Sequence, residues 1–136
     1  MPLLYFGIRV RNLERSIRFY RDVLGLKLVM EGEMGHGGKY AHLVDSKTHQ
    51  RLELNWYPPK SPFATKYVPG EGLDHLGFRT SDARRTFRRW VSLGARSAMK
   101  PWFDPTGQIL AYVKDPDGNW IEVFQVLKQP RKRKAA

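Results

Sequence analysis

The chain has 136 residues, 41% of them hydrophobic, which predicts one soluble globular unit or two small modules that share a core. It contains no cysteine, and this excludes disulfides, thiolate metal sites and thiol nucleophiles. The formal net charge of +11, from 24 Lys and Arg against 13 Asp and Glu, raises nucleic acid as a candidate partner.

The positive charge is concentrated at the C-terminal end of the sequence. Without the cations of this terminal run the net charge falls from +11 to +6, and most other arginines fall on two expected helices, where they form solvated faces. We therefore interpret residues 128–136 as a basic, disordered tail and do not expect a nucleic-acid partner. The cations of the run are Lys128, Arg131, Lys132, Arg133 and Lys134.

The sequence shows no sign of membrane insertion or export. No run reaches the roughly 18 to 20 apolar residues of a membrane span, and the N-terminal segment reaches Arg9 before a long apolar core forms. We therefore predict a cytoplasmic protein that does not bind membranes.

The first part of the chain predicts a β-α-β-β-β module. Residues 4–10 are typical of a short strand, and Asn12 then suits a helix N-cap. Apolar residues recur at helical spacing from Leu13 to Leu24, and Gly25 supplies a left-handed stop, so we expect one amphipathic helix of about three turns. Three strand-like segments follow, at residues 27–33, 39–45 and 51–57.

The pattern then restarts. Residues 58–72 contain prolines and glycines near both ends and are typical of a linker. Residues 73–79 match residues 3–9 at an offset of 70 and share a leucine, a glycine and an arginine. Asp82 suits the N-cap of a second helix, which Gly94 ends one position early relative to the first. Strands are expected at residues 96–100, 108–114 and 121–123.

This internal duplication determines the expected architecture. Residues 1–57 and residues 73–127 each predict a module that cannot bury its sheet alone, so the fold class is α+β with two tandem β-α-β-β-β modules. We expect the paired sheets to form an open cup, toward which related positions of the two modules converge.

Two pairs of chemically capable residues occupy related positions of this repeat. Glu53 and Glu122 each lie between apolar residues of a last strand, at an offset of 69, and Tyr5 lies opposite His75 at an offset of 70. A carboxylate on an apolar strand is costly to bury unless a cation or hydrogen bonds meet it. One imidazole and two carboxylates beside a phenol suit a divalent ion such as Ni, Zn, Mn, Co, Fe or Mg. We therefore predict a metal site formed by these four residues.

The sequence resembles the vicinal oxygen chelate superfamily and, within it, the glyoxalase I-like proteins. This resemblance implies paired modules around a divalent metal, in a homodimer whose sites can draw on both chains. The similar segments are residues 9–20 with 23–26, Leu52-Glu53-Leu54-Asn55-Trp56, Asp74-His75-Leu76-Gly77-Phe78 and Asp115-Pro116-Asp117-Gly118-Asn119-Trp120-Ile121-Glu122.

The resemblance also implies roles for individual residues. Glu53, His75 and Glu122 fall on three ligand positions of the family, whereas Tyr5 stands where the family usually has His or Gln. The implied activity is that of a metal-dependent lyase or isomerase resembling lactoylglutathione lyase, which moves a proton next to a carbonyl of a small metal-chelated substrate. Glu53 and Glu122 are both candidates for the catalytic base.

Substrate contacts are expected from a cation and from aromatic residues. Arg9 matches a family position that contacts the glutathione carboxylate, but Glu71 replaces a basic residue, so glutathione is left open as the thiol. Trp56, Trp102 and Trp120 suit the wall of an apolar substrate pocket, although packing in the core or in a dimer would use the same residues.

Two alternatives come from other functional classes. One is a metal-free binding protein resembling bleomycin-resistance proteins, which would sequester an aromatic or cationic ligand. The other is an Fe(II) ring-cleaving dioxygenase, in which His42 would join His75 and Glu122 in a two-His-one-carboxylate site.

Overall fold

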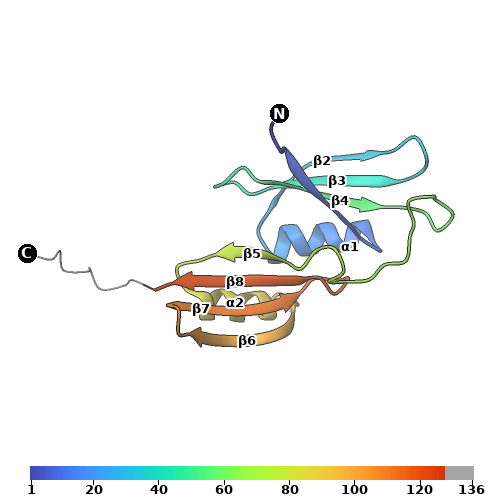
Figure 1. The fold of residues 1–136 in the computed structure, drawn as a ribbon. Helices are drawn as coiled ribbons and strands as arrows, with labels where there is room; N and C mark the ends of the chain where they lie inside the picture. The colour runs from blue at the N-terminus through green and yellow to red at the C-terminus, as the bar shows by residue number, and fades with distance from the viewer. Residues whose placement is uncertain (128–136) are drawn as a thin grey trace, which may run out of the picture.

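The computed structural model describes residues 1–127, and the basic segment 128–136 lies outside the described residues (Figure 1). In the described part of the chain, eight strands and two α-helices form two copies of one β-α-β-β-β pattern. The first copy comprises β1 (Tyr5–Arg9), α1 (Leu13–Arg18), the π-helical turn η1 (Phe19–Val23), β2 (Lys27–Glu33), β3 (Lys39–Val44) and β4 (Arg51–Trp56). The second comprises β5 (His75–Arg79), α2 (Ala83–Ser92), β6 (Arg96–Asp104), β7 (Gln108–Lys114) and β8 (Trp120–Val126).

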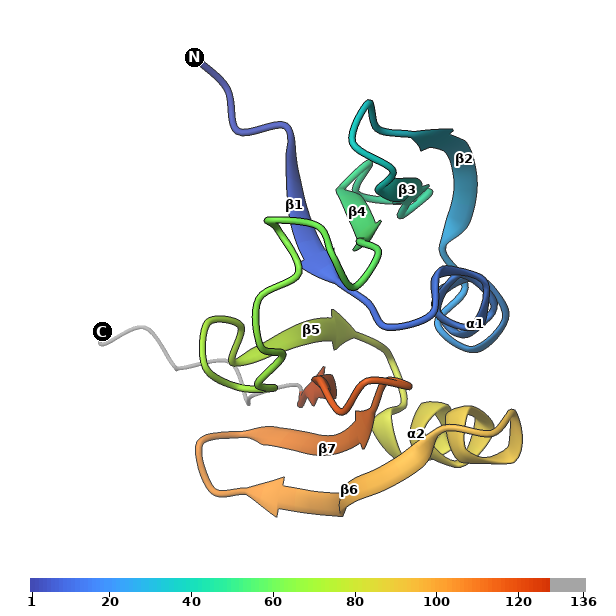
Figure 2. The same ribbon diagram turned by 90° about the vertical axis from the view of Figure 1, so that its right-hand side faces the viewer.

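The two copies have the same sheet topology, which confirms the predicted α+β class with two β-α-β-β-β units. The first sheet has the order β1-β4-β3-β2 and the second β5-β8-β7-β6. The first strand of each unit pairs in parallel with the last, and the other neighbours are antiparallel. Figure 2 shows α1 and α2 on the same side of the molecule, one beside each sheet.

Strand alternation separates an apolar face from a polar one in each sheet. On β4, Leu52 and Leu54 are buried in the core, and Glu53 between them points to the opposite face. On β8, Ile121 and Val123 are fully buried, and Glu122 between them again points away. The apolar faces of both sheets and both helices share one core. The two carboxylates therefore lie on the faces that the helices leave open.

The helix signals of the sequence are confirmed. The side chains of Asn12 and Asp82 accept hydrogen bonds from the third residue beyond, at 2.9 and 3.0 Å, and Gly25 and Gly94 have φ of +80° and +106°. α1 and η1 together span Leu13–Val23, one residue more than α2, and the π turn accommodates this extra residue. This explains why the two helix-ending glycines differ in offset.

Two strands of the second unit are longer than predicted. β6 runs to Asp104 rather than residue 100, and β8 covers Trp120–Val126 rather than residues 121–123 alone. The extension of β6 passes two register shifts, which allow the strand to continue past Pro101. Between β4 and β5 the chain forms turns and irregular structure without helix or strand. The division into modules 1–57 and 73–127 stays a prediction.

The turn between β7 and β8 forms hydrogen bonds with the helical segment of the first unit. Asp115 is fully buried and accepts a hydrogen bond of 2.8 Å from the hydroxyl of Tyr20, which η1 presents to it. Asp117 accepts from the backbone amide of Arg11 and from the side chains of Arg15 and Ser16. These contacts couple the two units through buried polar groups.

Within residues 1–127, no helix is long and apolar enough to cross a membrane. The cytoplasmic location stays a prediction.

Candidate metal centre

The first half-site lies on the open face of the first sheet and consists of Tyr5, His42 and Glu53. β3 and β4 place His42 directly opposite Glu53, with the imidazole Nε2 2.5 Å from the carboxylate Oε2. The Tyr5 ring packs on the His42 ring at a centroid distance of 5.3 Å. Both His42 and Glu53 are largely buried, with side chains 11% and 18% exposed.

Arg51 determines which nitrogen of the neutral His42 ring carries the proton. Its Nη1 lies 2.9 Å from His42 Nδ1, and because arginine can only donate, Nδ1 must accept. The proton is therefore on Nε2, which donates to Glu53. In this arrangement the imidazole lone pair faces Arg51 and the imidazole N–H faces the carboxylate.

The second half-site lies on the open face of the second sheet and consists of His75, Tyr112 and Glu122. β7 and β8 place Tyr112 opposite Glu122, and the phenol donates to Glu122 Oε2 at 2.7 Å. The His75 ring meets the Tyr112 ring edge-on at 5.6 Å, and His75 Nε2 lies 4.0 Å from Glu122 Oε2. The carboxylate of Asp74 accepts from His75 Nδ1 at 2.6 Å. The neutral His75 ring therefore presents the lone pair of Nε2 toward Glu122.

The surroundings of Tyr112, including its hydrogen bond to Glu122, raise the pKa of its phenol. Burial, followed by the hydrogen bond to Glu122 and its negative charge, raises the pKa of the Tyr112 phenol to about 12. Tyr112 therefore stays protonated and keeps donating to the carboxylate throughout the neutral range.

The half-sites contain the same three residue types with histidine and tyrosine exchanged. On the first strand of each unit (β1 and β5) Tyr5 corresponds to His75. On β3 and β7, called the middle strands below, His42 corresponds to Tyr112. Both pairs have an offset of 70. The carboxylates correspond at an offset of 69, because the turn between the last two strands spans residues 45–50 in the first unit and 115–119 in the second. One residue fewer in the second turn thus keeps each carboxylate opposite its middle-strand partner.

A glycine on the first strand makes room for each carboxylate. Gly7 is the register partner of Glu53, and Gly77 is that of Glu122. A Cβ on Gly7 would lie 3.0 Å from Asn55 Nδ2 and 3.8 Å from Glu53 Oε1, and one on Gly77 would lie 3.4 Å from Glu122 Oε1. The Oε1 atoms therefore lie beside glycines rather than side chains.

The predicted ligands do not all meet within one chain. The structure brings His75 to Glu122, and it brings Tyr5 and Glu53 to His42. Among residues 1–127, no three His, Cys, Asp or Glu side chains form a group that could hold a metal ion. The three-residue grouping of His42, His75 and Glu122 considered for a dioxygenase is thus also absent from the described part of a single chain.

The chemistry of each half-site nevertheless fits half of a divalent-metal site. Adjacent donors of an octahedral ion with bonds of about 2.1 Å lie about 3 Å apart. The nitrogen–oxygen separations of 2.5 Å at His42–Glu53 and 4.0 Å at His75–Glu122 lie on either side of this value. The second half-site can supply an imidazole nitrogen and a carboxylate oxygen after small side-chain adjustments. The first can do so once the His42 proton has moved from Nε2 to Nδ1.

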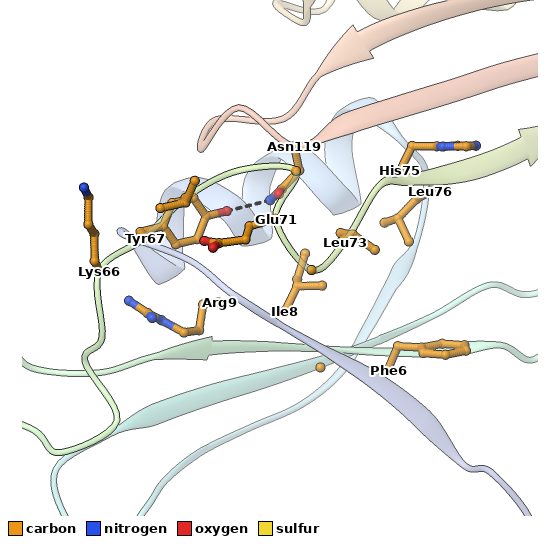
Figure 3. A pocket seen from close by; sticks show the side chains of 14 residues that line it. Phe6, Ile8, Arg9, Lys66, Tyr67, Glu71, Leu73, His75, Leu76 and Asn119 are labelled. Carbon is orange, nitrogen blue, oxygen red and sulfur yellow. Dashed lines mark hydrogen bonds between the residues drawn. The ribbon is translucent and has the colours of Figure 1, made fainter.

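A cavity of about 700 Å³ lies between β1 and the segment that precedes β5, and His75 is among its lining residues (Figure 3). The cationic side chains of Arg9 and Lys66 lie at one end, while Phe6, Leu76 and His75 lie at the other. Arg9 donates to Thr65 through both terminal nitrogens, at 2.6 Å each. The predicted substrate-binding role of Arg9 stays a prediction, and its side chain is already oriented by these bonds.

The three tryptophans predicted to bind substrate lie in different surroundings. Trp120 is exposed and its ring lies 5.2 Å from that of Tyr112, next to the second half-site. Trp102 is exposed on β6, where it pairs with Leu110 of β7. Trp56 packs against the core, with the Lys39 ammonium over its ring. Of the three, Trp120 lies closest to the candidate ligands.

Sequence reasoning overlooked three residues that complete the half-sites, namely Arg51, Asp74 and Tyr112. Tyr112 was detectable, since it lies 70 residues after His42 and the repeat had already paired the other positions. Arg51 and Asp74 carry no comparable sequence signal. Their importance depends on the direction in which each histidine ring turns.

Known proteins share both the sequence pattern and the fold. The Glyoxalase/Bleomycin resistance protein/Dioxygenase superfamily matches residues 3–123. The chain is 31% identical to a probable lactoylglutathione lyase of Synechocystis sp., covering 92% of this chain and 95% of the relative. It is also 31% identical to a lactoylglutathione lyase of Neisseria meningitidis, covering 92% and 91%.

A solved structure agrees with these sequence matches. Glyoxalase I from Zea mays superposes with a TM-score of 0.76 at 25% identity, over 94% of this chain and 46% of the maize chain. The two sheets have the same topology, and the repeat places a carboxylate at a corresponding position in each. The family model also matches residues 3–123. The chain belongs to the glyoxalase/bleomycin resistance protein/dioxygenase superfamily.

Proposed function

We propose that the protein is a glyoxalase I-like, metal-dependent lyase or isomerase that moves a proton next to a carbonyl group of a small substrate. The observation that carries this proposal is the placement of an imidazole beside a carboxylate in both half-sites, at 2.5 and 4.0 Å. The relatives named lactoylglutathione lyase support the same reaction class.

Glu53, His75 and Glu122 are the proposed ligands, with Tyr5 at the fourth family position. When bound, a divalent ion such as Ni, Zn, Mn, Co, Fe or Mg supplies Lewis-acid stabilisation for negative charge on the substrate oxygens. The remaining steps depend on side chains of this protein.

The catalytic base is one of the two glutamates. His42 and Tyr112 each hold Oε2 of the neighbouring carboxylate by a hydrogen bond, while Oε1 lies beside a glycine. Such a carboxylate takes the proton from the carbon next to the carbonyl and returns it to the adjacent carbon, so the isomerisation consumes no co-reactant. Glu53 and Glu122 remain equivalent candidates for this step.

We further propose that the complete site forms between two copies of the chain. Each half-site supplies only two strong donors, and the described part of one chain does not bring the halves together. Large apolar side chains on the two half-site sheets are exposed, and a second copy would cover them. They include Tyr5, Phe6, Trp102 and Trp120. A twofold dimer would then contain two equivalent sites.

The substrate is proposed to carry two adjacent oxygens and an anionic group. Arg9 and Lys66, against the single carboxylate of Glu71, leave one end of the cavity with a net positive charge, whereas Phe6 and Leu76 make the end near His75 apolar. This arrangement suits a small carbonyl compound joined to an acidic carrier. Whether glutathione is the carrier is decided by assay with and without it.

The metal-free binding protein is the second candidate, and the exposed aromatic side chains of Trp102 and Trp120 favour it. These rings lie on an open sheet face where a planar ligand could stack. Calorimetric titration with planar aromatic compounds in excess chelator distinguishes it, because tight binding without metal supports sequestration rather than catalysis.

The deciding experiment measures metal content and turnover together. Protein purified without chelator is analysed for metals, then loaded separately with Ni, Co, Zn and Mn and assayed with methylglyoxal and glutathione by thioester absorbance. We expect approximately one divalent ion per pair of half-sites and turnover that disappears with chelator and returns with metal. Metal uptake below about a tenth of an equivalent under every condition contradicts the proposal.

The variant that tests the ligand assignment is Glu122→Gln, which preserves the shape of the side chain and removes its charge. We expect this variant to fold normally and to lose retained metal. His75→Ala is expected to behave in the same way. If both variants hold metal as tightly as the parent, the site lies elsewhere.

A further inference from the structure

We infer that His42, rather than Tyr5, supplies the fourth donor of the metal site, so that the ligands are His42 and Glu53 from one copy with His75 and Glu122 from another. This inference rests on the proposed function and identifies a ligand at a position that the resemblance assigns to no role. Tyr5 on β1 has no imidazole to offer, and His42 on β3 supplies one instead.

The exchange between the half-sites is the first support. Each half-site contains one histidine, one tyrosine and one glutamate, and only the strands of the first two differ. The rings are neighbours in both cases, at 5.3 Å for Tyr5 and His42 and 5.6 Å for His75 and Tyr112. Moving the imidazole from β1 to β3, on the other side of β4, therefore displaces it by about one ring and leaves it beside the same β4 carboxylate.

The contact of His42 with Glu53 is the second support. The 2.5 Å separation between Nε2 and Oε2 places an imidazole nitrogen and a carboxylate oxygen where a common ion could contact both, after they part slightly. Tyr5 is packed on the His42 ring and is 43% exposed. Imidazole binds divalent metals in its neutral form, whereas a phenol must first lose its proton.

Arg51 regulates this ligand through its tautomer. Since Arg51 donates to Nδ1, the neutral His42 ring carries its proton on Nε2, the nitrogen that would bind the ion. Metal binding therefore requires the proton to move to Nδ1 and Arg51 to give up its hydrogen bond. His75 needs no such change, because Asp74 accepts from its Nδ1. Arg51 is thus a positioning residue that opposes metal binding at the first half-site.

The experiment compares metal dissociation constants of folded variants by competition with a chromogenic chelator. His42→Tyr places in the first half-site the phenol that Tyr112 supplies in the second. We expect it to weaken metal binding at least about 100-fold, because even partners that only orient a ligand contribute 10- to 100-fold. Tyr5→Phe keeps the packed ring and removes only the oxygen, so we expect a change below about threefold.

Two further variants test the mechanism of the replacement. Tyr5→His combined with His42→Tyr recreates the arrangement of the second half-site, and we expect it to regain most of the affinity that His42→Tyr loses. Arg51→Gln offers an amide oxygen that can accept from Nδ1, and we expect tighter binding by about tenfold. The absorption spectrum of Co(II)-loaded protein should change with His42→Tyr and not with Tyr5→Phe.

The outcomes separate this inference from the proposed function. A parent that takes up no divalent metal overturns both. A parent that binds metal and whose His42→Tyr variant binds it equally well, while Tyr5→Phe loses it, overturns the choice of His42 and leaves the proposed function intact. Thermal unfolding of each variant confirms that lost binding is not lost folding.

Discussion

The two halves of the candidate metal centre contain the same residue types but differ in how their hydrogen bonds prepare them. In the second half-site Asp74 accepts from His75 Nδ1 at 2.6 Å, which leaves Nε2 free toward Glu122. In the first half-site Arg51 donates to His42, and the imidazole N–H is directed at Glu53. The second half is prepared to bind a cation, whereas in the first half the imidazole N–H occupies the carboxylate oxygen.

This difference shows what a duplicated fold preserves and what it leaves free. Sheet register fixes a carboxylate opposite a middle-strand ring in both units. The neighbours that determine the proton on each ring differ between the units: Arg51 on β4 donates to His42, and Asp74, just before β5, accepts from His75. The two half-sites therefore contain the same residue types in different hydrogen-bonding states.

The largest effect is expected from removing either carboxylate. Glu53→Gln and Glu122→Gln should each lower turnover by about 10²- to 10⁴-fold, because each removes a proposed ligand or base. If the site is shared between copies, mixing the two inactive variants restores about a quarter of the parent activity, since half of the dimers are mixed and each has one intact site.

The mixed sample, refolded together and assayed beside each variant alone, tests the sharing directly. Unchanged, negligible activity after verified exchange of chains would mean that the halves do not meet across a dimer.

The next largest effect concerns the turns that precede the last strands. Asp115 is fully buried and accepts hydrogen bonds from the backbone amides of residues 117 and 119, from the Tyr20 hydroxyl and from the Asn119 side chain. Asp115→Ala should therefore lower the free energy of unfolding by at least about 3 kcal/mol. The corresponding Asp45 caps an exposed turn through Lys47 and Thr48. Asp45→Ala should therefore cost only about 0.5–1.5 kcal/mol. Urea unfolding measures both, and equal losses would contradict the asymmetry.

A smaller effect is expected from alkaline pH. The pKa of Tyr112 is raised to about 12 in the folded chain, mainly by burial and the Glu122 hydrogen bond, whereas an unfolded tyrosine titrates near 10. The stabilisation from Tyr112 is therefore complete below about pH 10 and declines as pH rises toward 12. Tyr112→Phe should show a shallower loss of stability over this window, measured by urea unfolding at several pH values. Parallel curves for parent and variant would refute the assignment.

The smallest effect concerns backbone strain in the longer turn. His49 has φ of +61°, a conformation that L-residues adopt at a cost and glycine adopts freely. His49→Gly should raise the free energy of unfolding by less than about 1 kcal/mol, because the entropy of the unfolded glycine offsets part of the relief. In the shorter turn Gly118 has φ of +94°, and Gly118→Ala should destabilise the protein instead. Two changes of the same sign would contradict this comparison.

Much of the architecture was predictable because it depends on local patterns. Helical spacing, the caps at Asn12 and Asp82, and the glycines that end each helix determined the elements, and the repeat determined their order. Strand lengths were less predictable, since β6 continues past Pro101 by means of register shifts that no local signal reveals.

The candidate site was predictable in composition but not in arrangement. The repeat identified Glu53, Glu122 and His75, because their positions follow from strand order. It paired Tyr5 with His75 but overlooked His42 with Tyr112, since a cross-strand contact depends on the register between β3 and β4 rather than on spacing within one strand.

The sequence by itself determined the two-unit α+β fold and a carboxylate on an open face of each sheet, because both follow from periodicity and repetition along the chain. Its motifs also carried the resemblance to the superfamily. Only the tertiary structure decided which side chains meet. Sheet register placed His42 against Glu53 and Tyr112 against Glu122, and contacts with Arg51 and Asp74 set the proton on each imidazole. The separation of the half-sites within the described chain also emerged only in three dimensions, because equivalence in a repeat specifies the position on a strand and not the distance between sheets.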